Sequence, residues 1–162
     1  MVTIDENFAL HITWTTYGSR LPGDERGYVS NTFVPGEGYE RKQNIPGTPV
    51  TADSEATRKR ARALQKWPTV YLTATEALAT ATALVEAAKR RGWRIVRAAI
   101  MTDHVHIVIV DCPDDGPAVR RILKGCAQAA LSDQHGSPRV WWTEGGSDRY
   151  KHGFLAIETA VD

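Results

Sequence analysis

Two histidines separated by one residue are the side chains of this sequence best suited to chemistry. His104 and His106 lie in the segment Asp103-His104-Val105-His106, which opens an apolar run. Side chains alternate across a strand, so both imidazoles should project from one face, about two rises of 3.3 Å apart. Imidazole is the commonest metal ligand near neutral pH. The pair is a candidate site for one metal ion. The alternative is two exposed or otherwise hydrogen-bonded histidines.

The apolar context of this pair favours the metal interpretation. The strand predicted from Val105 to Asp111 is apolar on both faces except for its histidines, so we expect it to lie in the centre of a sheet. Polar groups placed in such a strand cost free energy unless they are bonded. Another strand, predicted from Trp93 to Met101, should pair with it as a hairpin across the turn residues Thr102 and Asp103.

The remaining elements complete a simple plan. The first strand is predicted from Phe8 to Tyr17, and a helix from a capping box at Thr73 runs to about Arg91. The later elements are a helix over 117–133, a strand over 140–143 with a turn at 145–146, and the beginning of a helix over 154–162. The order predicts an α+β fold of the ferredoxin-like βαββαβ type. Its four-stranded antiparallel sheet would carry two helices on one face.

A long insertion follows the first strand. Residues 18–68 repeat Pro and Gly without sustained periodicity, apart from a helix predicted from about Thr51 or Asp53 to Trp67 and stopped by Pro68. Loops of this length in a compact domain are usually functional or disordered. We interpret 18–68 as a loop and helix insertion within one domain that covers 1–162.

Composition sets the broad class of protein. The 162 residues are 42% hydrophobic and 24% charged, which is the globular range and the size of one domain. We find no membrane-spanning stretch and no signal peptide, so the expected location is cytoplasmic with no membrane partner. The two cysteines, Cys112 and Cys126, do not form a metal-binding spacing and should be reduced.

The net charge of +1 conceals an uneven placement of the cationic residues. Half of them stand in two short clusters, which are Arg58, Lys59, Arg60, Arg62 and Lys66, and then Lys89, Arg90, Arg91, Arg94 and Arg97. Such runs are usually solvated faces. Contacts with nucleic-acid phosphates, made without reading sequence, are the functional alternative.

Three segments resemble a known family. Residues 98–110, AAIMTDHVHIVIV, are similar to the histidine signature of the HUH endonucleases, and in particular of the single-tyrosine transposases of insertion sequences and their REP-associated relatives. Residues 10–28, LHITWTTYGSRLPGDERGY, resemble the first strand and loop of one branch of that group. Residues 140–150, VWWTEGGSDRY, resemble its last strand.

The resemblance implies a DNA strand-transfer chemistry. In that family the histidines bind Mg²⁺ or Mn²⁺, so His104 and His106 would be both metal ligands and catalytic residues. The ion polarises a phosphate of single-stranded or hairpin DNA, and a tyrosine attacks it to give a 5′-phosphotyrosine. DNA, water and a third side chain would complete the metal shell. Family members act as homodimers or as monomers, and both assemblies remain open here.

The sequence departs from the family at its nucleophile. The resemblance puts that tyrosine on the helix after the last strand, just beyond Asp162. We therefore expect either a chain cut short before the nucleophile or a natural relic that has lost it. Tyr150 is the last tyrosine present and is a weaker catalytic candidate, with packing or base stacking as the alternative.

Further candidate residues concern DNA binding. Arg20 and Arg149 flank the strands that would build the site, and Arg120 and Lys124 lie on the helix before the last strand. All four are predicted to contact nucleic acid. The other histidines, His11, His135 and His152, carry no usable pattern, and the tryptophans of the predicted strands are expected in the core.

Three functions are compatible with these patterns. The first is a metal-dependent transposase that nicks and rejoins single-stranded hairpin DNA. The second is a catalytically dead or domesticated relative that binds structured DNA without cutting it. The third is an unrelated hydrolase that uses His104 and His106 to hold a metal, although no acidic base is placed with comparable clarity.

Overall fold

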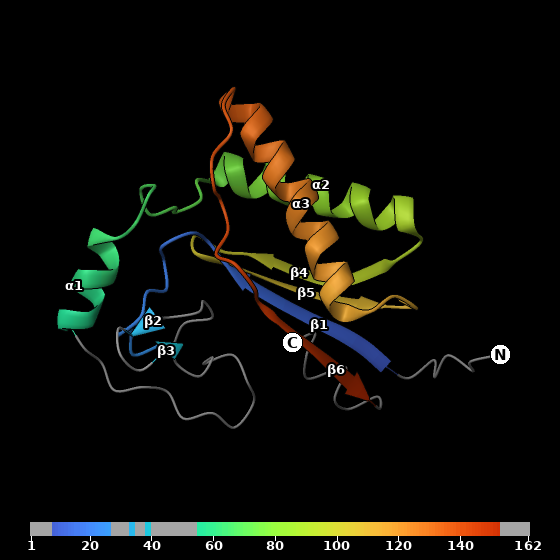
Figure 1. Ribbon diagram of the computed structural model, residues 1–162. Helices are drawn as coiled ribbons and strands as arrows, with labels where there is room; N and C mark the ends of the chain where they lie inside the picture. The colour runs from blue at the N-terminus through green and yellow to red at the C-terminus, as the bar shows by residue number, and fades with distance from the viewer. Residues whose placement is uncertain (1–7, 27–32, 35–37, 40–54, 153–162) are drawn as a thin grey trace.

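The computed structural model describes residues 8–26, 33–34, 38–39 and 55–152 (Figure 1). A four-stranded antiparallel sheet forms its frame, with the spatial order β4-β5-β1-β6. Its strands are β1 (Phe8–Thr15), β4 (Arg94–Ile100), β5 (His104–Val110) and β6 (Ser147–His152). This order is the ferredoxin-like one, and β5 has a neighbour on each side, so the predicted central position of the histidine strand is confirmed.

Two helices cover one face of this sheet. They are α2 (Ala74–Arg91) and α3 (Gly116–His135), which pack against each other on the same side of the strands (Figure 1). Every second residue of the central strands points toward them and is buried, as Leu10, Ile12 and Trp14 do in β1. None of the helices in the described residues is long and apolar enough to cross a membrane.

The first of these helices begins and ends where the sequence predicts. Thr73 and Glu76 form a reciprocal capping box, in which the Glu76 N–H donates to Thr73 Oγ1 at 3.3 Å and the Thr73 N–H donates to Glu76 Oε2 at 2.8 Å. Gly92 ends the helix in the left-handed region, with φ 73°. Glu76 also bonds His135 at 2.7 Å, which ties the start of α2 to the end of α3.

The prediction of the last strand is wrong. Residues 140–143 form an extended crossing segment with one isolated bridge, from Trp142 to Thr16, and the strand β6 starts only at Ser147. Trp141 and Trp142 are 1% and 6% exposed because this segment passes beneath α3. Their apolar side chains gave residues 140–143 the sequence pattern of a strand. The actual strand β6 has the polar sequence SDRYKH, which suits its position at the edge of the sheet.

The insertion contributes three short elements. They are β2 (Phe33–Val34), β3 (Gly38–Tyr39) and the helix α1 (Glu55–Ala63), which lies off one end of the sheet, away from α2 and α3 (Figure 1). The helix predicted to reach Trp67 stops at Ala63. Its predicted starts at Thr51 or Asp53, and the helix expected over 154–162, lie outside the described residues.

Candidate functional site

His104 and His106 lie on the sheet face turned away from α2 and α3. In the register of β1 and β5, His104 is opposite Thr15 and His106 is opposite Thr13, so these residues share one face. The two imidazole rings are 4.9 Å apart between centroids and meet edge to face at 88°. We call this surface, with His11, Thr13 and Arg149, the histidine face.

Asp103 orients the first histidine. The Nδ1 of His104 bonds Asp103 Oδ1 at 2.5 Å, which assigns the proton to Nδ1 and leaves Nε2 as a lone-pair donor. Burial raises the pKa of Asp103, but the bond and charge of His104, with Arg20 and Arg26, lower it overall. Asp103 is therefore an anion that holds the His104 ring in one orientation.

Two arginines in turn hold Asp103. Arg26 Nη1 donates to Asp103 Oδ2 at 3.4 Å, and Arg20 Nε lies 3.9 Å from the same oxygen. Arg26 is itself fixed by Asp24, which accepts from Nε at 2.9 Å and from Nη2 at 2.7 Å. These bonds lower the pKa of Asp24 to about 2. The start of the insertion thus supports the histidine strand through a chain of charged contacts.

His106 is oriented from the neighbouring strand. Its Nδ1 lies 3.1 Å from Thr13 Oγ1 and 3.3 Å from His11 Nε2, and the His11 ring stacks against it at 5.5 Å between centroids. Burial lowers the pKa of His106, and the charges of His104, His11 and Arg20 lower it further. Burial also lowers the pKa of His11, with Lys151 and Arg149 adding to the effect. These shifts favour neutral imidazoles.

Asp103, His11 and Thr13 also belong to this site, and no pattern in the sequence predicted them. Strand alternation puts His11 and Thr13 on one face, but their position beside His106 depends on the register between two strands nearly a hundred residues apart in sequence. Asp103 has the residue type and position of a turn residue between two strands. Its place directly before the histidine pair was the available signal for a role in orienting His104.

The histidine face presents two imidazoles side by side on one strand. Both Nδ1 atoms have partners, and neither Nε2 bonds a residue that the structure describes. The described residues contain no group of three or more His, Cys, Asp or Glu side chains that could hold a metal ion. Two imidazoles suit a divalent cation whose other ligands come from water, a substrate phosphate or a residue outside the described part.

Two of the predicted DNA contacts lie near the histidines. Arg149 of β6 is directly opposite His11 in the register, so it is on the histidine face. Arg20 reaches Asp103 and acts on the charge state of His106. Both therefore add positive charge beside His104 and His106, where an anionic substrate would be attracted.

Tyr150 lies on the opposite side of the sheet. It is paired with Leu10, a core residue under the helices, and its hydroxyl accepts a bond from the Gly116 N–H at 3.0 Å. Its ring contacts Phe8 at 5.9 Å between centroids. The sheet therefore separates the Tyr150 hydroxyl from His104 and His106, and this half-exposed residue links β6 to the start of α3.

Arg120 and Lys124 also lie on the helix side, where they bind the protein itself. Arg120 Nη1 donates to Asp148 Oδ2 at 2.5 Å, and Lys124 Nζ donates to the carbonyl oxygens of Thr143 and Gly145 at 2.6 and 2.7 Å. Burial lowers the pKa of Lys124 to about 8, with a further contribution from Arg120. Arg120 thus joins α3 to β6 itself, and Lys124 joins α3 to the segment just before β6.

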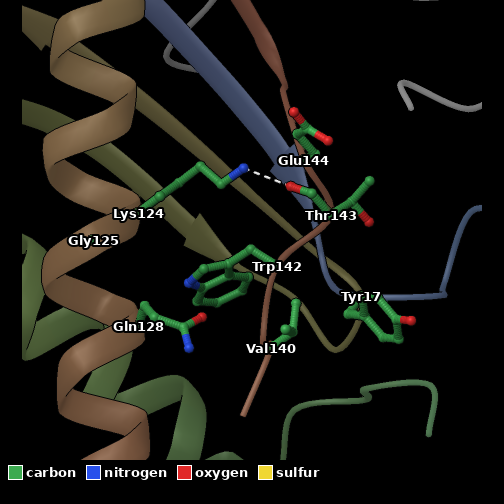
Figure 2. Close-up of a pocket in the computed structure, with 8 residues that line it drawn as sticks. All are labelled: Tyr17, Lys124, Gly125, Gln128, Val140, Trp142, Thr143 and Glu144. Carbon is green, nitrogen blue, oxygen red and sulfur yellow. Dashed lines mark hydrogen bonds between the residues drawn. The ribbon is translucent and has the colours of Figure 1, made fainter. Parts of the chain in front are cut away.

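Lys124 borders a surface cavity of about 440 Å³ between α3 and the crossing segment. Figure 2 shows the Lys124 side chain extending from α3 to the Thr143 carbonyl. The Trp142 indole lies between the helix and Val140. Tyr17, two residues after the end of β1, borders the far side. The cavity is separate from the histidine face.

Comparison with known proteins identifies the fold. No family model and no curated protein matches the sequence. Among solved structures, 98% of the chain matches a REP-associated tyrosine transposase bound to a REP hairpin, with a TM-score of 0.51 and 11% identity. The present chain covers 64% of the length of that transposase chain. It also matches a candidate transposase from Deinococcus radiodurans, with a TM-score of 0.53, 11% identity and coverage of 98% of this chain and 88% of that one.

These matches define the class of fold. The chain has the α+β architecture of the two transposases, with the four-stranded antiparallel sheet expected from its sequence. The first of these proteins is a REP-associated tyrosine transposase, the group that the sequence motifs resemble.

Proposed function

We propose that this protein is a single-tyrosine transposase of the HUH type that binds hairpin-forming single-stranded DNA and nicks and rejoins it. The observation that carries the proposal is the pair His104 and His106, which share one face of a ferredoxin-like sheet with both Nε2 atoms unbonded among the described residues. The structural likeness to two transposases, one of them bound to a REP hairpin, supports it.

The residues of the histidine face have separate roles in this proposal. His104 and His106 would hold Mg²⁺ or Mn²⁺, which when bound stabilises negative charge on the oxygens of the scissile phosphate. Asp103 keeps His104 in the ligand tautomer, and Thr13 with His11 fixes the ring of His106. Arg20 and Arg149 attract the DNA backbone toward this face.

The attacking hydroxyl would come from a tyrosine outside the described residues. Tyr150 does not suit this role, since its hydroxyl accepts from Gly116 on the helix side of the sheet. In the proposed reaction, the tyrosine oxygen forms a bond to phosphorus, the 3′ oxygen of the preceding nucleotide leaves as a free hydroxyl, and the later attack of a 3′-hydroxyl reverses the exchange. The bond energy is conserved in the phosphotyrosine, so rejoining needs no other cofactor.

A covalent-capture experiment tests the proposal. The 162-residue chain and a version extended through the next tyrosine of its reading frame are incubated with labelled single-stranded hairpin DNA and Mn²⁺, and products are separated on a denaturing gel. We expect both to bind the hairpin and only the extended chain to form an adduct. In the extended chain, a double substitution, His104→Ala with His106→Ala, should abolish the adduct and leave the fold intact.

Two outcomes would contradict the proposed function or its assignment of the nucleophile. An adduct from the short chain mapped to Tyr150 would make that residue the nucleophile. Hairpin binding without an adduct from the extended chain would favour the second candidate function, a relative that binds structured DNA but does not cut it. That candidate is supported by the same positive charge at Arg20 and Arg149.

A further inference from the structure

Helix α1 is rich in basic residues and does not pack into the hydrophobic core. None of its side chains is buried, although α2 and α3 each bury one face. Its nine residues include Arg58, Lys59, Arg60 and Arg62, whereas Glu55 is its one acidic residue. Arg58 pairs with Glu55 at 2.5 Å. The other three basic side chains make no ion pair or hydrogen bond with a residue that the structure describes.

A helix with no buried side chain gains little stabilisation from packing against the rest of the protein. Isolated helices shorter than about 12 residues are marginal in water, and most helices in proteins are stabilised by packing of an apolar face. Here that face is missing, and cationic groups crowd the surface instead. Binding of a polyanion would supply the missing stabilisation, because each neutralised charge also relieves repulsion within the helix.

The chain directly after α1 is firmly anchored. The Lys66 N–H donates to the Tyr17 hydroxyl at 3.1 Å, and the Val70 N–H donates to the Tyr17 carbonyl at 2.9 Å. Thr16 Oγ1 donates to the Val70 carbonyl at 2.7 Å. Gly18 accommodates this approach, since a Cβ there would lie 2.0 Å from Gln65 Nε2. Helix α1 therefore projects from a fixed base.

That base lies at the histidine end of the sheet. Thr15, next to the anchoring residues, is opposite His104, and the Thr16 N–H donates to the Asp103 carbonyl at 2.9 Å. Figure 1 shows α1 beyond this end of β1, clear of the layer formed by α2 and α3. Between the helix and the base, Leu64 and Trp67 remain 77% and 44% exposed. Two exposed apolar side chains thus lie on the segment that joins α1 to this base.

We propose that Lys59, Arg60, Arg62 and Lys66, here called the basic arm, contact the phosphates of the duplex stem of the hairpin. The inference rests on the proposed function, which places the single-stranded flank at the histidine face. A helix of nine residues is about 13 Å long, which matches roughly four base-pair steps of about 3.4 Å each. Contacts of this kind would position the stem without reading its sequence.

The test removes three charges from the arm. One variant carries Lys59→Gln, Arg60→Gln and Arg62→Gln. The matched control carries Lys89→Gln, Arg90→Gln and Arg91→Gln, which remove the same charge from the exposed last turn of α2. That turn is at the other end of the sheet, because the following strand starts at Arg94, opposite Val110. Dissociation constants are measured by fluorescence anisotropy over a series of KCl concentrations.

Two DNA probes separate the stem from the flank. One is a hairpin with a single-stranded flank, and the other is the flank alone. For the hairpin, we expect the arm variant to bind roughly tenfold more weakly or worse, and the slope of log K against log salt to fall by about 2 to 3, since each phosphate contact contributes about 0.9. Binding of the flank alone should not change. The control variant should keep the wild-type slope, and far-UV circular dichroism should show the same fold for all three proteins.

Each contrary result has a distinct meaning. An unchanged slope for the arm variant on the hairpin would overturn the arm proposal, while hairpin binding by the wild type would keep the proposed function. An equal loss on hairpin and flank would also overturn it, because the contact would then not involve the stem. A wild-type protein with no preference for the hairpin would contradict the proposed function and the arm proposal together.

Discussion

The backbone N–H of Gly116 donates to the hydroxyl of Tyr150 at 3.0 Å, which joins the first turn of α3 to strand β6. Helix N-termini leave backbone N–H groups without intrahelical partners, and the Asp115 side chain makes no capping bond here. The tyrosine therefore substitutes for a cap.

Replacing Tyr150 with Phe should lower stability and leave DNA chemistry intact. The substitution removes one hydrogen-bond acceptor, so we expect the free energy of unfolding to fall by about 0.5 to 1.5 kcal/mol in urea denaturation. The extended chain carrying Tyr150→Phe should still form the covalent adduct. Loss of the adduct at full stability would show that this hydroxyl takes part in the reaction.

The substitution Asp103→Asn should weaken metal binding. The amide cannot hold the proton of His104 Nδ1 as the carboxylate does, and loss of such supporting contacts typically costs about 10-fold to 100-fold in metal affinity. Titration calorimetry with Mn²⁺ measures the effect. Asp111→Asn is the control, since Asp111 pairs with Arg94 at 2.8 Å at the other end of the same strands. Equal affinities for the two variants would contradict the orienting role.

Lys124 should make stability increase with pH in the alkaline range. Burial lowers its folded pKa from 10.5 to about 8. Between these values the unfolded chain binds a proton that the folded chain lacks, so the free energy of unfolding rises with pH. The neutral amine still has two N–H groups for the two carbonyls that it bonds.

Lys124→Met tests this dependence. We expect the stability difference between wild type and Lys124→Met to grow in favour of the wild type from about pH 7 to about pH 9.5, measured by urea denaturation. The Lys89→Met variant, measured in the same way, controls for the loss of one lysine side chain at an exposed position. A wild-type advantage that shrinks with rising pH would contradict the assigned direction.

Two glycines should respond to alanine in opposite directions. Gly146 has φ 149°, and a Cβ there would meet the Thr13 carbonyl oxygen at 2.6 Å and Arg120 Cδ at 2.7 Å. Gly146→Ala should therefore destabilise the entry to β6 by more than about 1 kcal/mol. Gly125 is inside α3 with open space at its Cβ position, so Gly125→Ala should stabilise by about 0.5 to 1 kcal/mol. Thermal unfolding distinguishes the two, and destabilisation by both would contradict the open space at Gly125.

Local chemistry made most of the frame predictable from the sequence. The capping box at Thr73, the left-handed Gly92 and the alternation in β1 and β5 are each encoded within a few neighbouring residues. The error at Trp141 and Trp142 has the opposite origin. Their burial comes from α3 above them, and a window of strand-forming residues cannot separate that packing from pairing in a sheet.

The site was predictable to a smaller extent. The shared face of His104 and His106 follows from alternation alone. The contacts of His11 with His106, of Arg120 with β6 and of Lys124 with the chain before β6 depend on which strands are neighbours and how α3 lies over them. Those relationships join distant parts of the sequence, so charge and residue type alone could not predict the internal bonds of Arg120 and Lys124, and their predicted contact with DNA stays a prediction.

The spatial order of the sheet also constrains how the chain reaches its folded state. Strand β1 is made first, yet its two neighbours are β5 and β6, which lie far along the chain. The hairpin of β4 and β5 can form locally, whereas closure of β1 must await nearly the whole domain. During synthesis, the apolar β1 therefore stays unpaired until late, and this interval is when the nascent chain is most exposed to aggregation or to chaperones.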